Sequence, residues 1–158
     1  MLHRLNRQQI VPAPLEKVWA FFATPDNLNA ITPEDLHFEI IHGGGKHMVV
    51  GQLIEYRVQF IPLFKSRWLT EISHLEEKVS FVDEQRLGPY HFWYHQHHFE
   101  PVPGGTRIRD QVTYELPFGP LGELVHALWV GPRLTYIFDT RREIVATIFS
   151  PEPAVVPA

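Results

Sequence analysis

The 158-residue chain contains no cysteine, which excludes disulfide bonds and thiol chemistry. It also has no apolar run near the ~18 residues that a membrane-spanning helix needs. The first ten residues lack the apolar stretch of a signal peptide. Together these absences predict a cytoplasmic protein without stable membrane insertion. The net charge is −4 without a basic block, so we expect no nucleic-acid partner.

Aromatic residues, in contrast, are plentiful at 13% of the chain. Wide aromatic side chains are suited equally to a packed core and to the walls of a pocket. The segment 150–158 carries three prolines and no periodic apolar pattern, so we expect a Pro-rich C-terminal tail there. Because no linker or repeat interrupts residues 1–149, the sequence predicts one domain over that range.

The apolar spacing changes from strand-like to helical and back along the N-terminal half. A strand is predicted over 3–11, and Leu15, Val18, Trp19 and Phe22 then recur at helical spacing. A second short helix is expected to begin at Thr24. Alternation with a period of two then predicts six strands, joined by turns rich in Gly and Pro, over 36–41, 48–60, 66–72, 78–86, 90–100 and 106–116.

The last periodic segment is a long amphipathic helix over 119–148, which Pro132 should kink or restart. Its apolar stripe includes Leu124, Leu128 and Leu134, while Arg141 near its end is expected to be solvated. One such helix is the only element large enough to cover the sheet. The sequence therefore predicts an α+β fold, with a seven-stranded curved antiparallel sheet wrapped around the C-terminal helix and two short helices after strand 1.

With this order of elements, the chain resembles the START/polyketide-cyclase superfamily of helix-grip (SRPBCC) proteins. The segments that carry the resemblance are APLEKVW at 13–19, FF at 21–22, TPDNL at 24–28, ITP at 31–33, GQLIEY at 51–56, RWLTEI at 67–72 and HQHHFEPVPGGTRIRDQVTYELPFG at 95–119. Their order and spacing are similar to a bacterial subgroup of ligand-binding SRPBCC or cell-division-inhibitor-related proteins. The superfamily includes lipid carriers, hormone receptors, aromatases and cyclases, and chaperone activators. The resemblance therefore implies a cavity, and it does not imply a particular reaction.

The polar residues of most interest fall on the two strands predicted before the long helix. His95 and His97 share a strand face with Trp93, and Asp110 shares a face with the apolar Val112 of the next strand. Because the apolar face must point inward, it takes Asp110 inward too. We therefore expect a cluster of His95, His97 and Asp110 inside the fold.

This cluster has four interpretations. Asp110 accepts hydrogen bonds from His95 or His97 as part of a satisfied buried network, or these groups orient a mostly apolar ligand. A His–Asp pair could also act as a general base, which makes His95, His97 and Asp110 the weak catalytic candidates. A metal site would need a third ligand and outer-shell partners, and solvated surface histidines explain the pattern more simply, so no metal and no cofactor are predicted.

The leading hypothesis is binding, transport or sensing of an apolar small molecule such as a lipid, an isoprenoid or a polyketide. The residues predicted to line its cavity are Tyr56, Val58, Trp68, Trp93, His95, His97, Asp110, Tyr114, Leu124, Leu128 and Leu134. The alternatives are an aromatase/cyclase-type enzyme that uses the His–Asp pair, and an interaction module linked to cell division whose interior is filled by side chains. Binding is favoured because no nucleophile motif stands out. A protein partner, or a homodimer formed through a sheet edge, stays open.

Overall fold

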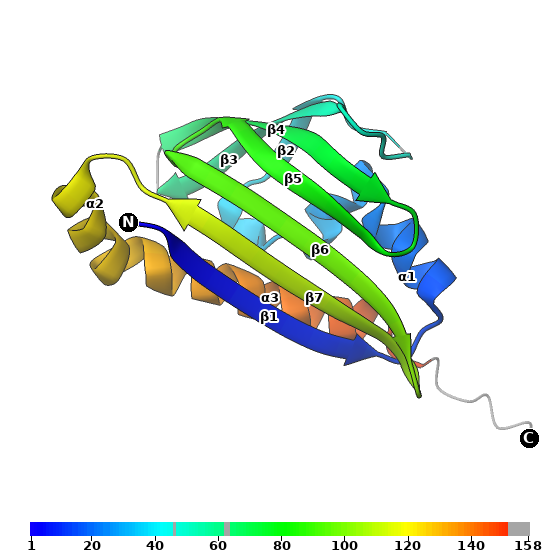
Figure 1. Ribbon diagram of the computed structural model, residues 1–158. Helices are drawn as coiled ribbons and strands as arrows, with labels where there is room; N and C mark the ends of the chain where they lie inside the picture. The colour runs from blue at the N-terminus through cyan, green and yellow to red at the C-terminus, as the bar shows by residue number, and fades with distance from the viewer. Residues whose placement is uncertain (46, 62–63, 152–158) are drawn as a thin grey trace, which may run out of the picture.

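A computed structural model of the chain describes residues 1–45, 47–61 and 64–151. The elements follow in the order strand, short helices, six strands and a long helical segment (Figure 1). They are β1 (His3–Val11), α1 (Leu15–Phe22), η1 (Pro25–Ile31), η2 (Glu34–Leu36), β2 (Glu39–His42), β3 (Leu53–Ile61), β4 (Phe64–Glu76), β5 (Ser80–Leu87), β6 (Phe92–Val102), β7 (Gly105–Glu115), α2 (Gly119–Val125), η3 (His126–Val130) and α3 (Gly131–Ile148).

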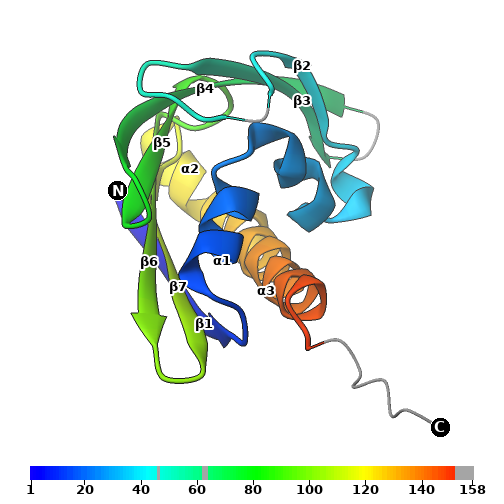
Figure 2. The ribbon, with the colours of Figure 1, turned by 90° about the vertical axis from the view of Figure 1, so that its right-hand side faces the viewer.

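The seven strands form one sheet in the order β1-β7-β6-β5-β4-β3-β2, and every neighbouring pair is antiparallel. The sheet curves around α3, and α1 closes one end of the space between them (Figure 2). This is the predicted helix-grip arrangement. Short connections between consecutive strands from β3 to β7, and a longer one between β2 and β3, account for the meander, and β1 completes the sheet by pairing with β7.

The N-terminal helices bury the side chains that their spacing predicted. Val18, Trp19 and Phe22 of α1 are buried, and Pro25 occupies the first turn of η1, where its missing N–H leaves no bond unmade. The second helix is a 3₁₀ helix, and a further 3₁₀ turn, η2, follows it. Because η2 occupies 34–36, β2 begins at Glu39 and not at residue 36 as predicted.

The C-terminal helix is interrupted, as Pro132 predicted, although the interruption lies just before the proline. Pro132 has no N–H to donate to the carbonyl of Leu128, and η3 widens into a π-helical turn there. After the turn, α3 buries Leu134, Ile137, Phe138 and Val145 against the sheet. No helix among the described residues is long and apolar enough to cross a membrane.

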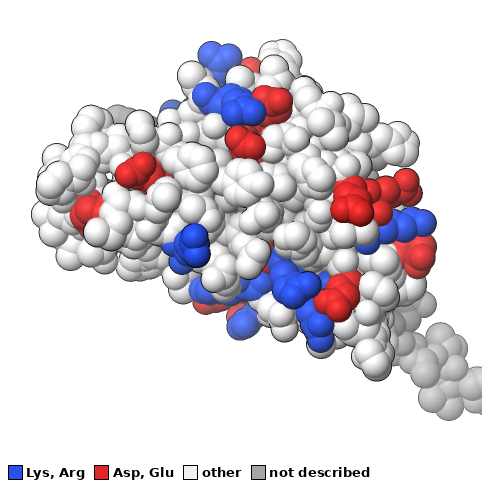
Figure 3. All heavy atoms as spheres, viewed as in Figure 1, with Lys and Arg blue, Asp and Glu red and all other residues white. Residues whose placement is uncertain are grey.

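The α2 segment does not cover the sheet. In Figure 1 it extends beyond the ends of the strands. Leu124 of α2 is 55% exposed, and Leu128 of the following η3 is 74% exposed. Few charged side chains cover this end of the molecule, whereas acidic and basic groups are interspersed over the outer face of the sheet (Figure 3). The predicted boundary at residue 149 stays a prediction, and residues 152–158 of the predicted tail lie outside the described residues.

Candidate functional site

A cavity of about 140 Å³ lies between the inner face of the sheet and α3. Buried side chains of both hydrophobic clusters line it, among them Trp68, Trp93 and Leu134 of one and Phe22 and Phe81 of the other. Its walls are mostly apolar, and the polar lining residues include Asp83, His95, His97 and Arg141. An apolar cavity with a few convergent polar groups is the usual form of a small-molecule site.

The register of three adjacent strands builds the polar group at this cavity. Both histidines lie on β6; His95 stands directly opposite Asp83 of β5, and His97 stands directly opposite Asp110 of β7. Since residues two apart share a strand face, each histidine also lies diagonally across from the second carboxylate. The result is a closed arrangement in which acidic and basic side chains alternate.

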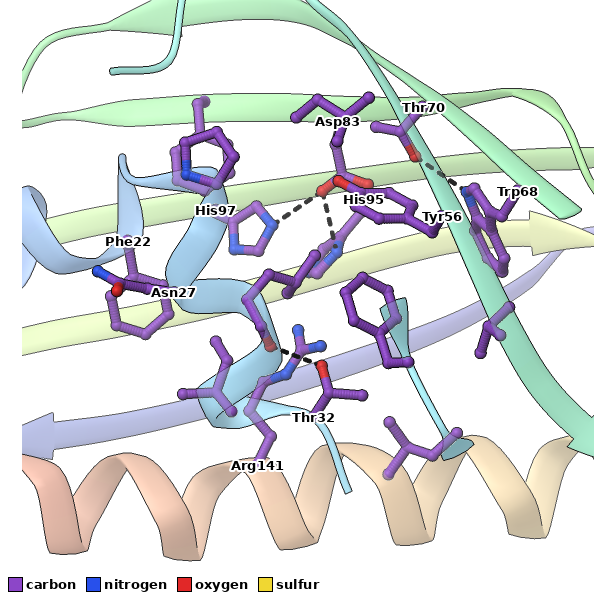
Figure 4. Close-up of a pocket in the computed structure, with 18 of the residues that line it drawn as sticks. Phe22, Asn27, Thr32, Tyr56, Trp68, Thr70, Asp83, His95, His97 and Arg141 are labelled. Carbon is purple, nitrogen blue, oxygen red and sulfur yellow. Dashed lines mark hydrogen bonds and ion pairs between the residues drawn. The ribbon is translucent and has the colours of Figure 1, made fainter. Parts of the chain in front are cut away.

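The distances show how tightly this arrangement closes. His95 has Nε2 at 3.1 Å from Asp110 Oδ1 and Nδ1 at 3.3 Å from Asp83 Oδ2. His97 has Nε2 at 3.0 Å from Asp83 Oδ2, a hydrogen bond, and both histidine–Asp83 contacts are drawn in Figure 4. His97 Nδ1 lies 2.9 Å from Asp110 Oδ1 but does not meet hydrogen-bond geometry, so its ring does not serve both carboxylates at once.

Electrostatics favour the charged forms within this cluster. Burial alone raises the pKa values of Asp83 and Asp110, but the neighbouring histidines outweigh it and hold both pKa values well below the usual range. Burial lowers the pKa of His95, yet Asp83 and Asp110 outweigh this effect and raise it. A neutral imidazole has one N–H, whereas His95 faces a carboxylate oxygen from each nitrogen, as an imidazolium would.

Arg141 of α3 reaches the same cavity from the opposite side and was predicted to be solvated. Its side chain points from the helix towards the sheet, and its Nε is buried without a hydrogen-bond partner among the described residues (Figure 4). Burial lowers the pKa of Arg141, although Asp110, Asp83 and Tyr56 act against this. An arginine keeps its charge under such conditions, so the cavity holds a cationic donor with unused capacity.

Trp68 and Tyr56 form part of the apolar wall. Trp68 Nε1 donates to Thr70 Oγ1 at 2.9 Å, which satisfies the indole and fixes its ring. Tyr56 packs against Phe38 with ring centroids 4.7 Å apart, and burial strongly raises its pKa. In Figure 4 Trp68 lies on the far side of the cavity from His97 and Arg141, so the cavity has a polar end and an apolar end.

A second cavity of about 440 Å³ lies beyond the apolar end. It is lined by side chains of α2, η3 and α3, with Tyr90 and Leu116 from the sheet side. Leu134 and Ile137 line both cavities. These two side chains therefore form the shared wall that separates the cavities.

The structure places most of the predicted lining residues at the inner cavity: Tyr56, Val58, Trp68, Trp93, His95, His97 and Leu134. Asp110 and Tyr114 were also predicted to line this cavity but are not among its lining residues: Asp110 pairs with the two histidine rings, and the Tyr114 hydroxyl lies 2.8 Å from His126 Nε2. The predicted placement of Leu124 and Leu128 in the cavity is wrong, because both are exposed on the segment beyond the sheet. The interpretation of His95 and His97 as surface residues is also wrong, since they are 4% and 5% exposed.

Sequence reasoning missed Asp83 and Arg141. Asp83 shares a strand face with Phe81, which lines the cavity, but Phe81 and Val82 are both apolar and both buried. The alternation therefore left the inward face of this strand ambiguous. Arg141 falls three residues after Phe138 and four after Ile137, which is the spacing of the buried helix face. That spacing is the signal that could have placed it inside.

The curved sheet, the long C-terminal helix and the mostly apolar cavity between them define a helix-grip protein. The chain belongs to the family described as polyketide cyclase/dehydrase and lipid transport, whose model matches residues 11–133. This family and the cavity together support the binding of a hydrophobic small ligand. A search of curated protein sequences finds no match to the chain.

Solved structures from several organisms share this fold. Protein CV1439 from Chromobacterium violaceum superposes with a TM-score of 0.70 at 14% identity, covering 94% of this chain and 98% of its own. TTHA0849 from Thermus thermophilus superposes with a TM-score of 0.66 at 20% identity, covering 92% of this chain and 95% of its own. Ginseng major latex-like protein 151 from Panax ginseng superposes with a TM-score of 0.65 at 15% identity, covering 96% of this chain and 99% of its own. At these identities the likeness concerns the fold alone.

Proposed function

We propose that this protein binds a small apolar molecule that carries an acidic oxygen, with its apolar body against Trp68 and its oxygen at Arg141. The observation that supports this most directly is the polarity of the inner cavity. Arg141 brings a buried Nε without a hydrogen-bond partner to one end, while aromatic and aliphatic side chains form the other. A carboxylate or phenolate would supply the missing acceptor.

The size of the cavity narrows the proposed ligand class. Its volume of about 140 Å³ is comparable to the engineered cavity of ~150 Å³ that admits benzene. A single-ring aromatic acid or a short-chain acid fits this space. A longer ligand, such as an isoprenoid or a fatty acid, would have to displace the shared wall of Leu134 and Ile137 and extend into the second cavity.

The test compares pairs of ligands that differ only in the acidic group. Isothermal titration calorimetry would measure 4-alkylbenzoates against the matching alkylbenzenes, over a series of alkyl lengths. We expect the benzoates to bind more tightly, since a hydrogen bond to a charged group contributes about 1.5–3 kcal/mol, roughly 10- to 100-fold in affinity. Native mass spectrometry of protein purified from its own host would show whether such a compound is already carried.

Arg141→Met should remove this preference, because methionine keeps the apolar stem and loses the donor. Arg142→Met is the matched control, since Arg142 is the next residue and is exposed. Benzoate binding should fall about 10- to 100-fold in the first variant and be unchanged in the second, with alkylbenzene binding equal in both. Equal benzoate affinity in Arg141→Met and the parent would contradict the proposed ligand orientation.

A further inference from the structure

The cavity wall also brings three metal-ligating side chains to one point. Asp83 offers Oδ2, His95 offers Nδ1 and His97 offers Nε2, and these donor atoms lie within 4.8 Å of one another. We infer that Asp83, His95 and His97 bind one divalent transition-metal ion of the zinc class. This inference goes beyond the proposed function and does not depend on the organic ligand.

Two of the three donor–donor distances are close to those of a loaded site, and the third is at most 4.8 Å. Zinc takes histidine nitrogen at about 2.0–2.1 Å and carboxylate oxygen at about 2.0–2.2 Å, which puts tetrahedral donors roughly 3.3 Å apart. Asp83 Oδ2 is 3.3 Å from His95 Nδ1 and 3.0 Å from His97 Nε2. Small rotations of these side chains would therefore admit the ion, without any change in the strands that carry them.

Asp110 supplies the outer partner that such a site requires. A histidine that binds metal through one nitrogen usually donates its other N–H to a carboxylate or a carbonyl, which fixes the ring and its tautomer. Asp110 Oδ1 lies 3.1 Å from His95 Nε2 and 2.9 Å from His97 Nδ1, the two nitrogens that face away from Asp83. The contact with His95 is a hydrogen bond, whereas the His97 ring would have to turn as the ion binds in order to donate to the same carboxylate. Asp110 is therefore a positioning residue, for His95 first.

Packing holds the two rings in place. Phe81 stacks on His97 with centroids 4.1 Å apart and an interplanar angle of 20°. Phe138 meets His95 edge-on with centroids 5.4 Å apart. Histidines fixed in this way lose little rotational freedom when they bind an ion, so the site is already organised for its ligand.

The charges around the three ligands are compatible with a bound divalent cation. Asp83 and Asp110 balance its two positive charges, whereas Arg141 adds a like charge that opposes binding. With three protein ligands, a tetrahedral ion keeps one position open. Asp83, His95 and His97 all line the cavity, so the open position would face it.

The first test uses the unaltered protein, freed of metal by a chelator and of any affinity tag by cleavage. Isothermal titration calorimetry with Zn²⁺ should show one equivalent bound, and Co²⁺ should give visible absorption bands of a tetrahedral site. Nitrogen-15 NMR of the histidine rings with Zn²⁺ should identify His95 Nδ1 and His97 Nε2 as the metal-bound nitrogens. Absence of stoichiometric binding, or metal-induced shifts confined to other histidines, would overturn the inference.

Variants then test each role against a matched control. His97→Gln and Asp83→Asn should abolish tetrahedral Co²⁺ bands, whereas His98→Gln, on the opposite face of the same strand, should retain them. Asp110→Asn should weaken Zn²⁺ binding about 10- to 100-fold, as outer-shell changes do, and should broaden the two ring-nitrogen signals. Retention of the parent spectrum by both His97→Gln and Asp83→Asn would assign the metal to another place.

Arg141→Met separates this inference from the proposed function. Removal of the like charge should tighten Zn²⁺ binding, while the same change weakens benzoate binding. Zinc binding without a benzoate preference would leave the metal site standing and refute the ligand orientation. A benzoate preference without zinc binding would do the reverse.

Discussion

Removal of the Asp110 charge should destabilise the protein far more than removal of an exposed carboxylate. Asp110 faces two histidine rings that are almost fully buried, and its Oδ1 accepts from His95 Nε2 at 3.1 Å. Asparagine has nearly the same shape, so Asp110→Asn changes charge with little change in packing. Since Asp83 still faces both rings, one half of the charge compensation remains.

The expected loss follows from these contacts. A hydrogen bond to a charged group contributes about 1.5–3 kcal/mol against about 0.5–1.5 for a neutral one, and asparagine can retain the neutral bond. Loss of one whole partner of a buried ion pair costs about 3–5 kcal/mol, and here a second carboxylate is left. We therefore expect Asp110→Asn to lower the free energy of unfolding by about 2–3 kcal/mol.

Urea denaturation of the metal-free protein in the presence of a chelator measures this loss. Asp139→Asn is the control, because Asp139 pairs with Arg7 at 2.8 Å while both side chains stay partly exposed, and solvent-exposed pairs contribute about 0.2–1 kcal/mol. If the two variants lost equal stability, the buried cluster would contribute no more than a surface pair. That result would refute the reasoning.

The loss should also depend on pH in a defined direction. The pKa of Asp110 is lowered in the folded protein, so its contribution is complete above the unfolded pKa of about 4 and is lost as the pH falls through the folded pKa. The pKa of His95 is raised, so its contribution is complete below the unfolded pKa of about 6.5 and is lost as the pH rises through the folded pKa. The difference between Asp110→Asn and the parent should thus be greatest between about pH 4 and 6.5.

Three further predictions concern other parts of the fold. Leu134→Ala should join the two cavities, cost about 2–5 kcal/mol in unfolding free energy and shift binding towards longer 4-alkylbenzoates in calorimetry; an unchanged length preference would mean that the wall stays closed. Gly105→Ala should lower the midpoint of thermal unfolding more than Gly104→Ala, because a Cβ at Gly105 would lie 1.9 Å from the carbonyl oxygen of Val11, whereas one at Gly104 meets no atom within 4 Å. Burial and His3, whose ring stacks on that of His126 with centroids 3.5 Å apart, lower the pKa of His126. The contribution of His126 to stability should therefore be lost as the pH falls below about 6.5. NMR titration of the His126 ring should give a midpoint below that of a free histidine, and a midpoint above it would contradict the stacking argument.

The strand pattern predicted the fold and three of the four side chains of the polar cluster. Clean alternation in the last two strands placed His95, His97 and Asp110 on inward faces, because a strand with one apolar face can pack in only one orientation against the core. Asp83 could not be placed in the same way, since Phe81 and Val82 are consecutive apolar residues and both are buried. Its meeting with the histidines depends on the pairing of β5 with β6, which alternation within a single strand does not specify.

The C-terminal helix shows what hydrophobic periodicity alone does not predict. Its periodicity correctly gave the buried face that includes Leu134, but the same stripe continued through Leu124 and Leu128, which are exposed. Periodicity identifies the apolar face of a helix, and it does not say how far the opposing sheet extends. Arg141 lies on that same face, where a long side chain with a charged end lines the cavity.

The location of both histidines on one strand has a consequence for how the gene can vary. Successive residues of β6 point to opposite sides of the sheet, so a one-codon change that shifts the register of β6 by one residue against β5 and β7 would turn both imidazoles outward and bring Gln96 and His98 to the cavity side. A change of two codons would restore the facing. Among descendants of the gene, the length of this strand should therefore change in steps of two residues wherever the site is retained. The turn at Pro103 and Gly104 lies outside the paired residues of β6 and β7, so its length is free to change by one residue.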